Sequence, residues 1–420
     1  MIRRLALLGA TVLTACAVPA AAASSPVLEA TATYQNPPTL PGGGVLGGFS
    51  DIYPAGTSGK TFWAITDRGP NNSDGDNPIF VDPTFTPEIL LVSRDGSKLT
   101  IQQQIPLRTP DGYTDPVTKT RLITGLPNLP PTDDAPVDVH GKALPLDPYG
   151  VDTEGLVRAP NGTFWISEEN RSSVLHVDAD GTVLSRLVPS NQTTYQAPGV
   201  TVLPILPAIV STQKPNRGLE GLAISADGNT LYVAQQSPLN NPTTSVSKKS
   251  RNLRIYRLDT KKPSVTGEFV NVRDKDNSDD GDWKTSAMVW LSPDRLLIEE
   301  RDAEQPTVHT LLYAVDFGHA TNILGTHWDT SDTPTLEQLG PSDLADNGVV
   351  SGKKTLVFDA KKAKLGNGKI EDLALTPDGG KSLLTLINDN DFGVDSITSN
   401  GTVKLNKIPT RLDSYQIDTP

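Results

Sequence analysis

The sequence predicts an all-β fold, and three observations support this prediction. Glycine and proline supply 35 residues each of the 420, which is more helix breakers than a helical protein carries. Hydrophobic residues still make up 36% of the chain, enough to bury a core. A short phrase also recurs along the chain, and each copy has the pattern of a β-hairpin. Together these features predict a turn-rich globular protein made of repeated hairpins.

The repeated phrase opens with an acidic residue, commonly followed by Gly-Leu, and continues as an alternating strand. A tight turn, a second strand and a polar cluster follow. Asn161-Gly162 and Asp227-Gly228 are turns of the kind that join paired antiparallel strands. The copies occupy residues 48–68, 152–171, 218–237, 286–302 and 370–391.

Another strand pair follows the hairpins, as at Val174–Val177 and Val183–Val188. Four strands per unit, repeated along the chain, are typical of a β-propeller. Five copies are visible, but the intervals exceed an ordinary blade of about 40–50 residues, so we favour six blades over five. A β-sandwich is the alternative, which the recurring acid disfavours. Long polar insertions, expected to be surface loops, fall at 69–88, 109–150, 189–217, 238–250 and 271–284.

Residues 1–23 have the pattern of an export signal, in which Arg3 and Arg4 precede a short apolar run. Cleavage after Ala23 would give a secreted or periplasmic protein, whereas Leu13–Cys16 resembles a lipobox that would anchor a lipoprotein through Cys16. Cys16 is the only cysteine, so no intramolecular disulfide is expected. We expect residues 24–420 to form a single propeller domain with no transmembrane segment.

The net charge of −12 and the 49 acidic side chains restrict the partners. Nucleic acid and anionic membranes are disfavoured, because their phosphates attract basic surfaces. Cationic partners, and metal ions above all, fit this composition better. We expect the protein to be a monomer.

The hairpins bring carboxylates together. In an antiparallel hairpin the start of the first strand lies beside the end of the second, and the first strand of a propeller blade lines the central channel. Carboxylate oxygens suit Ca²⁺, whereas the lack of other cysteines and of a His-x-x-x-His spacing argues against zinc. The predicted metal ligands on this face are Asp51, Asp67, Glu154, Glu169, Glu220, Glu299, Glu371, Asp389 and Asp391.

The same face carries residues that we expect to act in catalysis. Arg68, Arg217 and Arg301 have the fork-shaped guanidinium that suits an anionic substrate group and charge developing in a transition state. Glu168 or Glu300 would act as the carboxylate that activates a water on the metal. The alternative for each residue is a structural ion pair between blades. No Gly-x-Ser-x-Gly elbow is present, so a serine hydrolase mechanism has no support.

Several motifs resemble those of the phytase-like family described as having esterase-like activity. The resemblance runs from Gly47 to Phe392, and it implies an exported bacterial propeller that hydrolyses esters or phosphoesters. Ser286 and Gln235-Gln236 depart from the acids that other copies carry at these places. The motifs are Thr66–Asn71, Glu154–Leu156, Trp165–Glu169, Arg217–Leu222, Gln236–Leu239 and Asn388–Phe392.

We therefore predict an exported esterase-like or phosphoesterase-like hydrolase that binds a small anionic ester with Ca²⁺ on its carboxylate face. One alternative is a lactonase-like calcium propeller. The other is a propeller that binds a ligand without turnover, since a fold does not determine a function.

Overall fold

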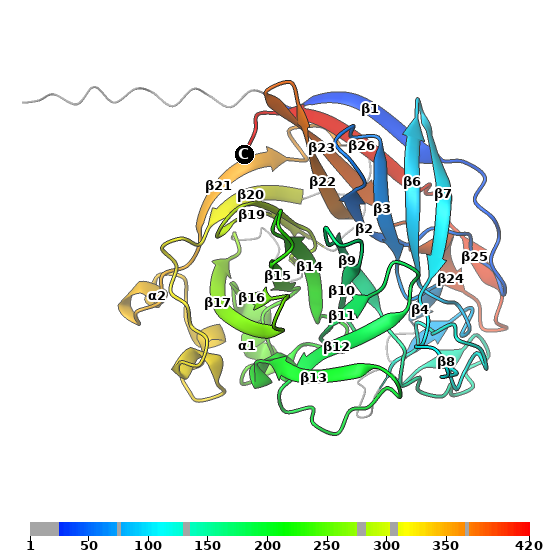
Figure 1. The fold of residues 1–420 in the computed structure, drawn as a ribbon, viewed down its shortest axis with the longest axis horizontal. Helices are drawn as coiled ribbons and strands as arrows, with labels where there is room; N and C mark the ends of the chain where they lie inside the picture. The colour runs from blue at the N-terminus through cyan, green and yellow to red at the C-terminus, as the bar shows by residue number, and fades with distance from the viewer. Residues whose placement is uncertain (1–24, 74–76, 129–134, 275–282, 303–309, 366–368) are drawn as a thin grey trace, which may run out of the picture.

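A computed structural model describes residues 25–73, 77–128, 135–274, 283–302, 310–365 and 369–420 (Figure 1). The predicted export signal and Cys16 lie outside the described residues. Within the described part of the chain, no helix is long and apolar enough to cross a membrane.

The described residues form a β-propeller of five four-stranded blades around a central axis (Figure 1). Blade 1 contains β2 (Phe49–Pro54), β3 (Thr61–Thr66), β6 (Glu88–Asp95) and β7 (Lys98–Pro106). Blade 2 contains β9 (Thr153–Arg158), β10 (Phe164–Glu168), β11 (Ser173–Val177) and β12 (Val183–Pro189), extended by β13 (Thr201–Leu206). Blade 3 contains β14 (Leu219–Ile224), β15 (Thr230–Gln235), β16 (Asn252–Asp259) and β17 (Ser264–Val272).

Blade 4 contains β18 (Met288–Ser292), β19 (Arg295–Arg301), β20 (Thr310–Asp316) and β21 (Lys353–Asp359). Blade 5 contains β22 (Ile370–Asp378), β23 (Lys381–Asn388), β26 (Arg411–Ile417) and, as its outermost strand, β1 (Val27–Tyr34). Because β1 pairs with β26 from the other end of the chain, the first and last strands close the ring. β1 also pairs briefly with β7, which joins blades 5 and 1 into one eight-stranded sheet.

The propeller prediction is confirmed, but the number of blades differs from the six that we favoured. The described residues of the long intervals form small added elements instead of a further blade. These are β4 (Asn71–Ser73), β5 (Pro78–Phe80) and β8 (Val137–Asp138), the hairpin β24 (Val394–Ile397) and β25 (Val403–Leu405), and the short helices α1 (Thr244–Lys249), α2 (Asp343–Asp346), η1 (Ala208–Thr212), η2 (His327–Asp329), η3 (Leu336–Gln338) and η4 (Asp391–Gly393).

Each pair of neighbouring blades buries a hydrophobic cluster between its sheets. Because side chains of a strand alternate between its two faces, adjacent residues enter different clusters. Ala64 packs between blades 5 and 1, while Ile65 packs between blades 1 and 2. Both faces of the blades are therefore covered, and the inner strands β2, β9, β14, β18 and β22 contact one another in a closed ring.

The inner strands approach so closely that two of them require glycine. A Cβ on Gly155 would lie 2.4 Å from the backbone oxygen of Glu220 in the next blade. A Cβ on Gly221 would lie 2.7 Å from the backbone oxygen of Ser286. The glycine that follows the acid in the second and third copies thus sets the spacing of blades 2, 3 and 4 around the axis.

We predict that Gly155→Ala lowers the free energy of unfolding by about 1–3 kcal/mol, because the added methyl group overpacks the junction of two blades. Gly56→Ala is the matched control, since a Cβ there meets nothing within 4 Å. The control should change stability by less than about 0.5 kcal/mol. Denaturant unfolding of both variants measures the difference, and equal midpoints would contradict this account of the ring.

Candidate functional site

One backbone hydrogen bond recurs at the same place in all five blades and shows which of their residues are equivalent. In every blade a residue at or just after the end of the second strand donates its N–H to the carbonyl of a residue shortly before the first strand, as Glu169 does to Asp152 at 3.0 Å. Three positions per blade follow from this alignment, and we number them as channel positions. The first is Gly48, Asp152, Gly218, Lys284 and Lys369; the second is Ser50, Glu154, Glu220, Ser286 and Glu371; the third is Asp67, Glu169, Gln236, Arg301 and Asp389.

A cavity of about 490 Å³ opens at these positions, and its charge is divided between two sides. Blades 1 to 3 supply carboxylates together with Gln236 and Arg68, whereas blades 4 and 5 supply Lys284, Arg301 and Lys369 together with Glu371, Asp389 and Asp391. The insertion that contains β4 and β5 forms a polar wall with Asn71, Asn72 and Asn77. One side of the cavity is therefore mainly acidic, and the other combines cationic and acidic side chains.

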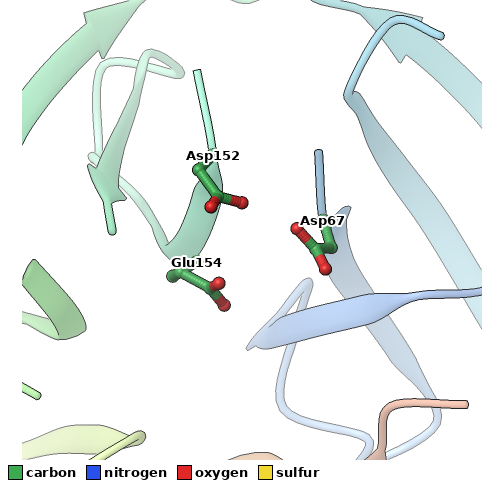
Figure 2. A group of neighbouring side chains, drawn as sticks. All are labelled: Asp67, Asp152 and Glu154. Carbon is green, nitrogen blue, oxygen red and sulfur yellow. The ribbon is translucent and has the colours of Figure 1, made fainter. Parts of the chain in front are cut away.

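Two groups of carboxylates on the first side could hold a metal ion. Asp67, Asp152 and Glu154 each place one oxygen within 4.8 Å of the others, and Figure 2 shows these three carboxylates facing one another. Glu154 also forms a second such group with Glu169 and Glu220. Glu154 is thus common to both groups.

Asp152 gives a direct test of whether the site fits a metal ion. Its side chain is only 2% exposed, and neither of its carboxylate oxygens has hydrogen-bond geometry to a described residue. Arg68 lies 3.1 Å from Oδ2. A buried carboxylate of this kind needs a compensating cation, and a set of oxygen donors suits a hard ion such as Ca²⁺. The residues present fit a cation of this type.

The carboxylates in these groups also disfavour one another's charge. Burial raises the pKa of Glu154 well above its usual range, and the neighbouring Glu220 and Glu169 raise it further. Burial likewise raises the pKa of Glu220 and of Asp152. Gln236 moderates the crowding, because its Nε2 donates to Glu169 at 2.5 Å and to Glu220 at 2.8 Å. The amide in the third copy thus separates two acids.

On the other side of the cavity, three of the predicted metal ligands lie in ion pairs. Lys369 binds Asp389 and Asp391 and lies 3.5 Å from Glu371. Arg301 also binds Glu371, and its Nε donates to Ser286 at 2.7 Å. Although burial acts in the opposite direction, Arg301 and Lys369 lower the pKa of Glu371. The positive charges of Lys369 and Arg301 therefore offset the negative charges of these three predicted ligands.

Asp51 is a predicted metal ligand that the structure places outside the cavity. It follows Ser50, which holds the second channel position of blade 1, so alternation along β2 turns it away. Its carboxylate accepts the backbone N–H of Leu156 and hydrogen-bonds to Asp372 of blade 5. Burial raises the pKa of Asp51 to about 6. Asp51 joins three blades at their inner strands.

Glu168 and Glu300 also lie outside the cavity, each one residue before a third channel position and on the opposite face of its strand. Glu168 accepts the backbone N–H of Arg171 at 3.0 Å and lies 3.5 Å from Arg186. Glu300 accepts from Lys354 at 2.6 Å. The structure therefore places both predicted water-activating carboxylates in ion pairs within the blades.

The remaining predicted residues divide between the cavity and its surroundings. Arg68 and Arg301 line the cavity, whereas Arg217 and Glu299 do not. Burial raises the pKa of Glu169, and Lys284 and Arg217 lie close enough to oppose this rise. Glu299 is fully buried beneath Arg301, two residues earlier on β19, and burial raises its pKa to about 8 against the opposing effect of Arg301.

Sequence reasoning missed Asp152, Lys284 and Lys369. Each stands two residues before the second channel position, and residues two apart on a strand share a face. This periodicity could have identified all three. The wall of Asn71, Asn72 and Asn77 carried no comparable signal, because it lies in an insertion without a counterpart in the other blades.

We predict that Glu299→Gln stabilises the protein at high pH. Folding raises the pKa of Glu299 from about 4.5 to about 8. Between these two pH values the unfolded chain loses its proton more readily than the folded protein, so the free energy of unfolding falls as the pH rises. The variant should match the unaltered protein near pH 5 and exceed it by at least about 1 kcal/mol near pH 8. Thermal unfolding at both pH values tests this, and a destabilised variant at pH 8 would show that the charged form is the stable one.

One family of known proteins matches most of the chain. The family model Phytase-like, described as esterase-like activity of phytase, matches residues 45–392. An uncharacterized secreted protein of Arthroderma benhamiae is 28% identical over 246 residues, and the match covers 51% of this chain and 48% of that one. The chain thus matches about half the length of this curated relative. The bacterial origin stays a prediction.

Similar solved structures include a luciferin-regenerating enzyme, with 9% identity, a TM-score of 0.35, and coverage of 94% of this chain and 95% of that one. A virginiamycin B lyase from Staphylococcus aureus has 12% identity, a TM-score of 0.31, and coverage of 92% and 98%. Scores this low carry no argument about activity. The family match spans most of the propeller, from before β2 to η4. The chain belongs to the phytase-like family described by esterase-like activity.

Proposed function

We propose that this protein is an exported hydrolase of phosphate or carboxyl esters that works with Ca²⁺ in the central cavity. The observation that carries the proposal is the divided charge of this cavity. One side groups oxygen ligands around Glu154, and the other presents Lys284, Arg301 and Lys369. The name of the Arthroderma benhamiae relative supports export.

The residues that would hold the cation are Asp67, Asp152, Glu154 and Glu220. They supply oxygen only, and burial makes the charge of Asp152, Glu154 and Glu220 costly without a partner. A bound Ca²⁺ would polarise a phosphoryl or carbonyl oxygen and offset negative charge. Glu371, Asp389 and Asp391, which we expected to bind metal from the sequence, instead hold the cationic side chains in place.

Arg301, Lys284 and Lys369 would bind the anionic group of the substrate. Arg301 is fixed by Glu371 and Ser286, so its guanidinium is preorganised. Burial lowers the pKa of Lys284, and Arg217 and Arg301 lower it further. An anion beside Lys284 would relieve this repulsion between cations. The cationic side therefore favours a substrate that carries negative charge, or acquires it in the transition state.

We assign the general base to Glu169 in place of Glu168 and Glu300. Glu169 lines the cavity, and burial raises its pKa, which makes it a stronger base than an ordinary carboxylate. Nε2 of Gln236 donates a hydrogen bond to Oε1 of Glu169 at 2.5 Å, and this contact orients the carboxylate. The other oxygen, Oε2, would take the proton that the attacking water loses.

The test is turnover of a panel of chromogenic phosphomonoesters and carboxyl esters. We predict activity that a chelator removes and Ca²⁺ restores. Glu154→Gln should lower kcat/KM by about 10²-fold or more, because this residue is common to both carboxylate groups. Glu88→Gln is the matched control, since Glu88 is a partly buried acid on β6 that hydrogen-bonds to Gln104 outside the cavity.

A folded protein that turns over no ester with Ca²⁺ present would reject the hydrolase proposal. Thermal stabilisation by an anionic ester without product would instead identify a binding protein. Ca²⁺-dependent turnover that favours lactones over both ester classes would identify the lactonase-like alternative.

A further inference from the structure

Arg68 stands at the boundary between the carboxylate groups and the rest of the cavity. Its side chain is 9% exposed, and its Nη1 lies 3.1 Å from Oδ2 of Asp152. The same Nη1 donates to Oδ1 of Asn216 at 3.1 Å, and the guanidinium carbon lies 5.5 Å from the centre of the Phe80 ring. The guanidinium is thus held by an amide and an aromatic ring as well as by the acid.

Asp152 is also one of the three acids whose oxygens could surround a cation. A cation on Asp67, Asp152 and Glu154 would lie close to the positive charge of Arg68. Two cations next to one carboxylate repel each other, and the repulsion is strong in a buried site. Asp152 therefore cannot satisfy both partners fully at once.

We propose that Arg68 and the cation compete for Asp152, so that cation binding turns Arg68 toward the anionic ligand. The inference rests on the proposed cation site. Asn216 and Phe80 keep the guanidinium inside the cavity when its contact with Asp152 weakens. Thermodynamic linkage then requires that the cation and the anion each tighten the binding of the other. Arg68 is a positioning residue in this scheme.

The experiment is calorimetric titration of Ca²⁺ into the full chain and into Arg68→Met. Removing the competitor should tighten Ca²⁺ binding by about tenfold, within the range of 5–150-fold that is typical of couplings between sites. Arg158→Met is the control for the loss of one positive charge. Arg158 also lies over an aromatic ring, 5.0 Å from the centre of Trp63, but it does not line the cavity.

A second pair of variants separates competition for Asp152 from a general change in charge. In the Asp152→Asn background, position 152 has no carboxylate for which Arg68 and Ca²⁺ can compete. Adding Arg68→Met to this background should therefore tighten Ca²⁺ binding by less than about threefold. An equal gain in both backgrounds would overturn the competition. Unchanged or weaker binding by Arg68→Met alone would also overturn it.

Titration with inorganic phosphate tests whether the cation also tightens the binding of an anion. Saturating Ca²⁺ should tighten phosphate binding to the unaltered protein, and Arg68→Met should lose most of this effect. Phosphate affinity that does not depend on Ca²⁺ would contradict the proposed turn of Arg68. Absence of Ca²⁺ binding in every variant would refute the proposed cation site itself, and the inference with it.

Discussion

The structure depends on one constraint, which is that five inner strands meet around a single axis. Equivalent residues of the five blades become neighbours there, so an acid that recurs in the sequence becomes a crowded group in space. Buried like charges within a few ångströms raise one another's pKa or require a cation. The ion pairs of blades 4 and 5 meet this requirement, and the proposed cation site would meet it on blades 1 to 3.

The chain meets the requirement differently on its two sides. Lys369 and Arg301 replace acids at channel positions and neutralise Glu371, Asp389 and Asp391. On the opposite side Arg68 forms an ion pair with Asp152, while Gln236 separates Glu169 from Glu220. This imbalance distinguishes a site that could hold a cation from a set of structural ion pairs. It also accounts for the ion pairs in which three of the predicted metal ligands lie, Glu371, Asp389 and Asp391.

The hairpin turns and the alternation of the strands were sufficient to predict the propeller. The blade number was not, because the length of an interval does not reveal whether it contains a blade or an insertion such as the one with β4 and β5. Asp67, Glu154, Glu169 and Glu220 could be brought together from the sequence. Asp51 could not be placed, because a shift of one residue along a strand turns a side chain to the other face.

The central claim is that the cation site lies on blades 1 to 3. The most direct measurement is anomalous diffraction from crystals grown with Ca²⁺, or with a heavier ion of similar chemistry. The account predicts a peak bounded by Asp67, Asp152 and Glu154, with or without a second peak toward Glu220. A peak between Glu371 and Asp391, where Lys369 now lies, or no peak in the cavity at saturating Ca²⁺, would contradict it.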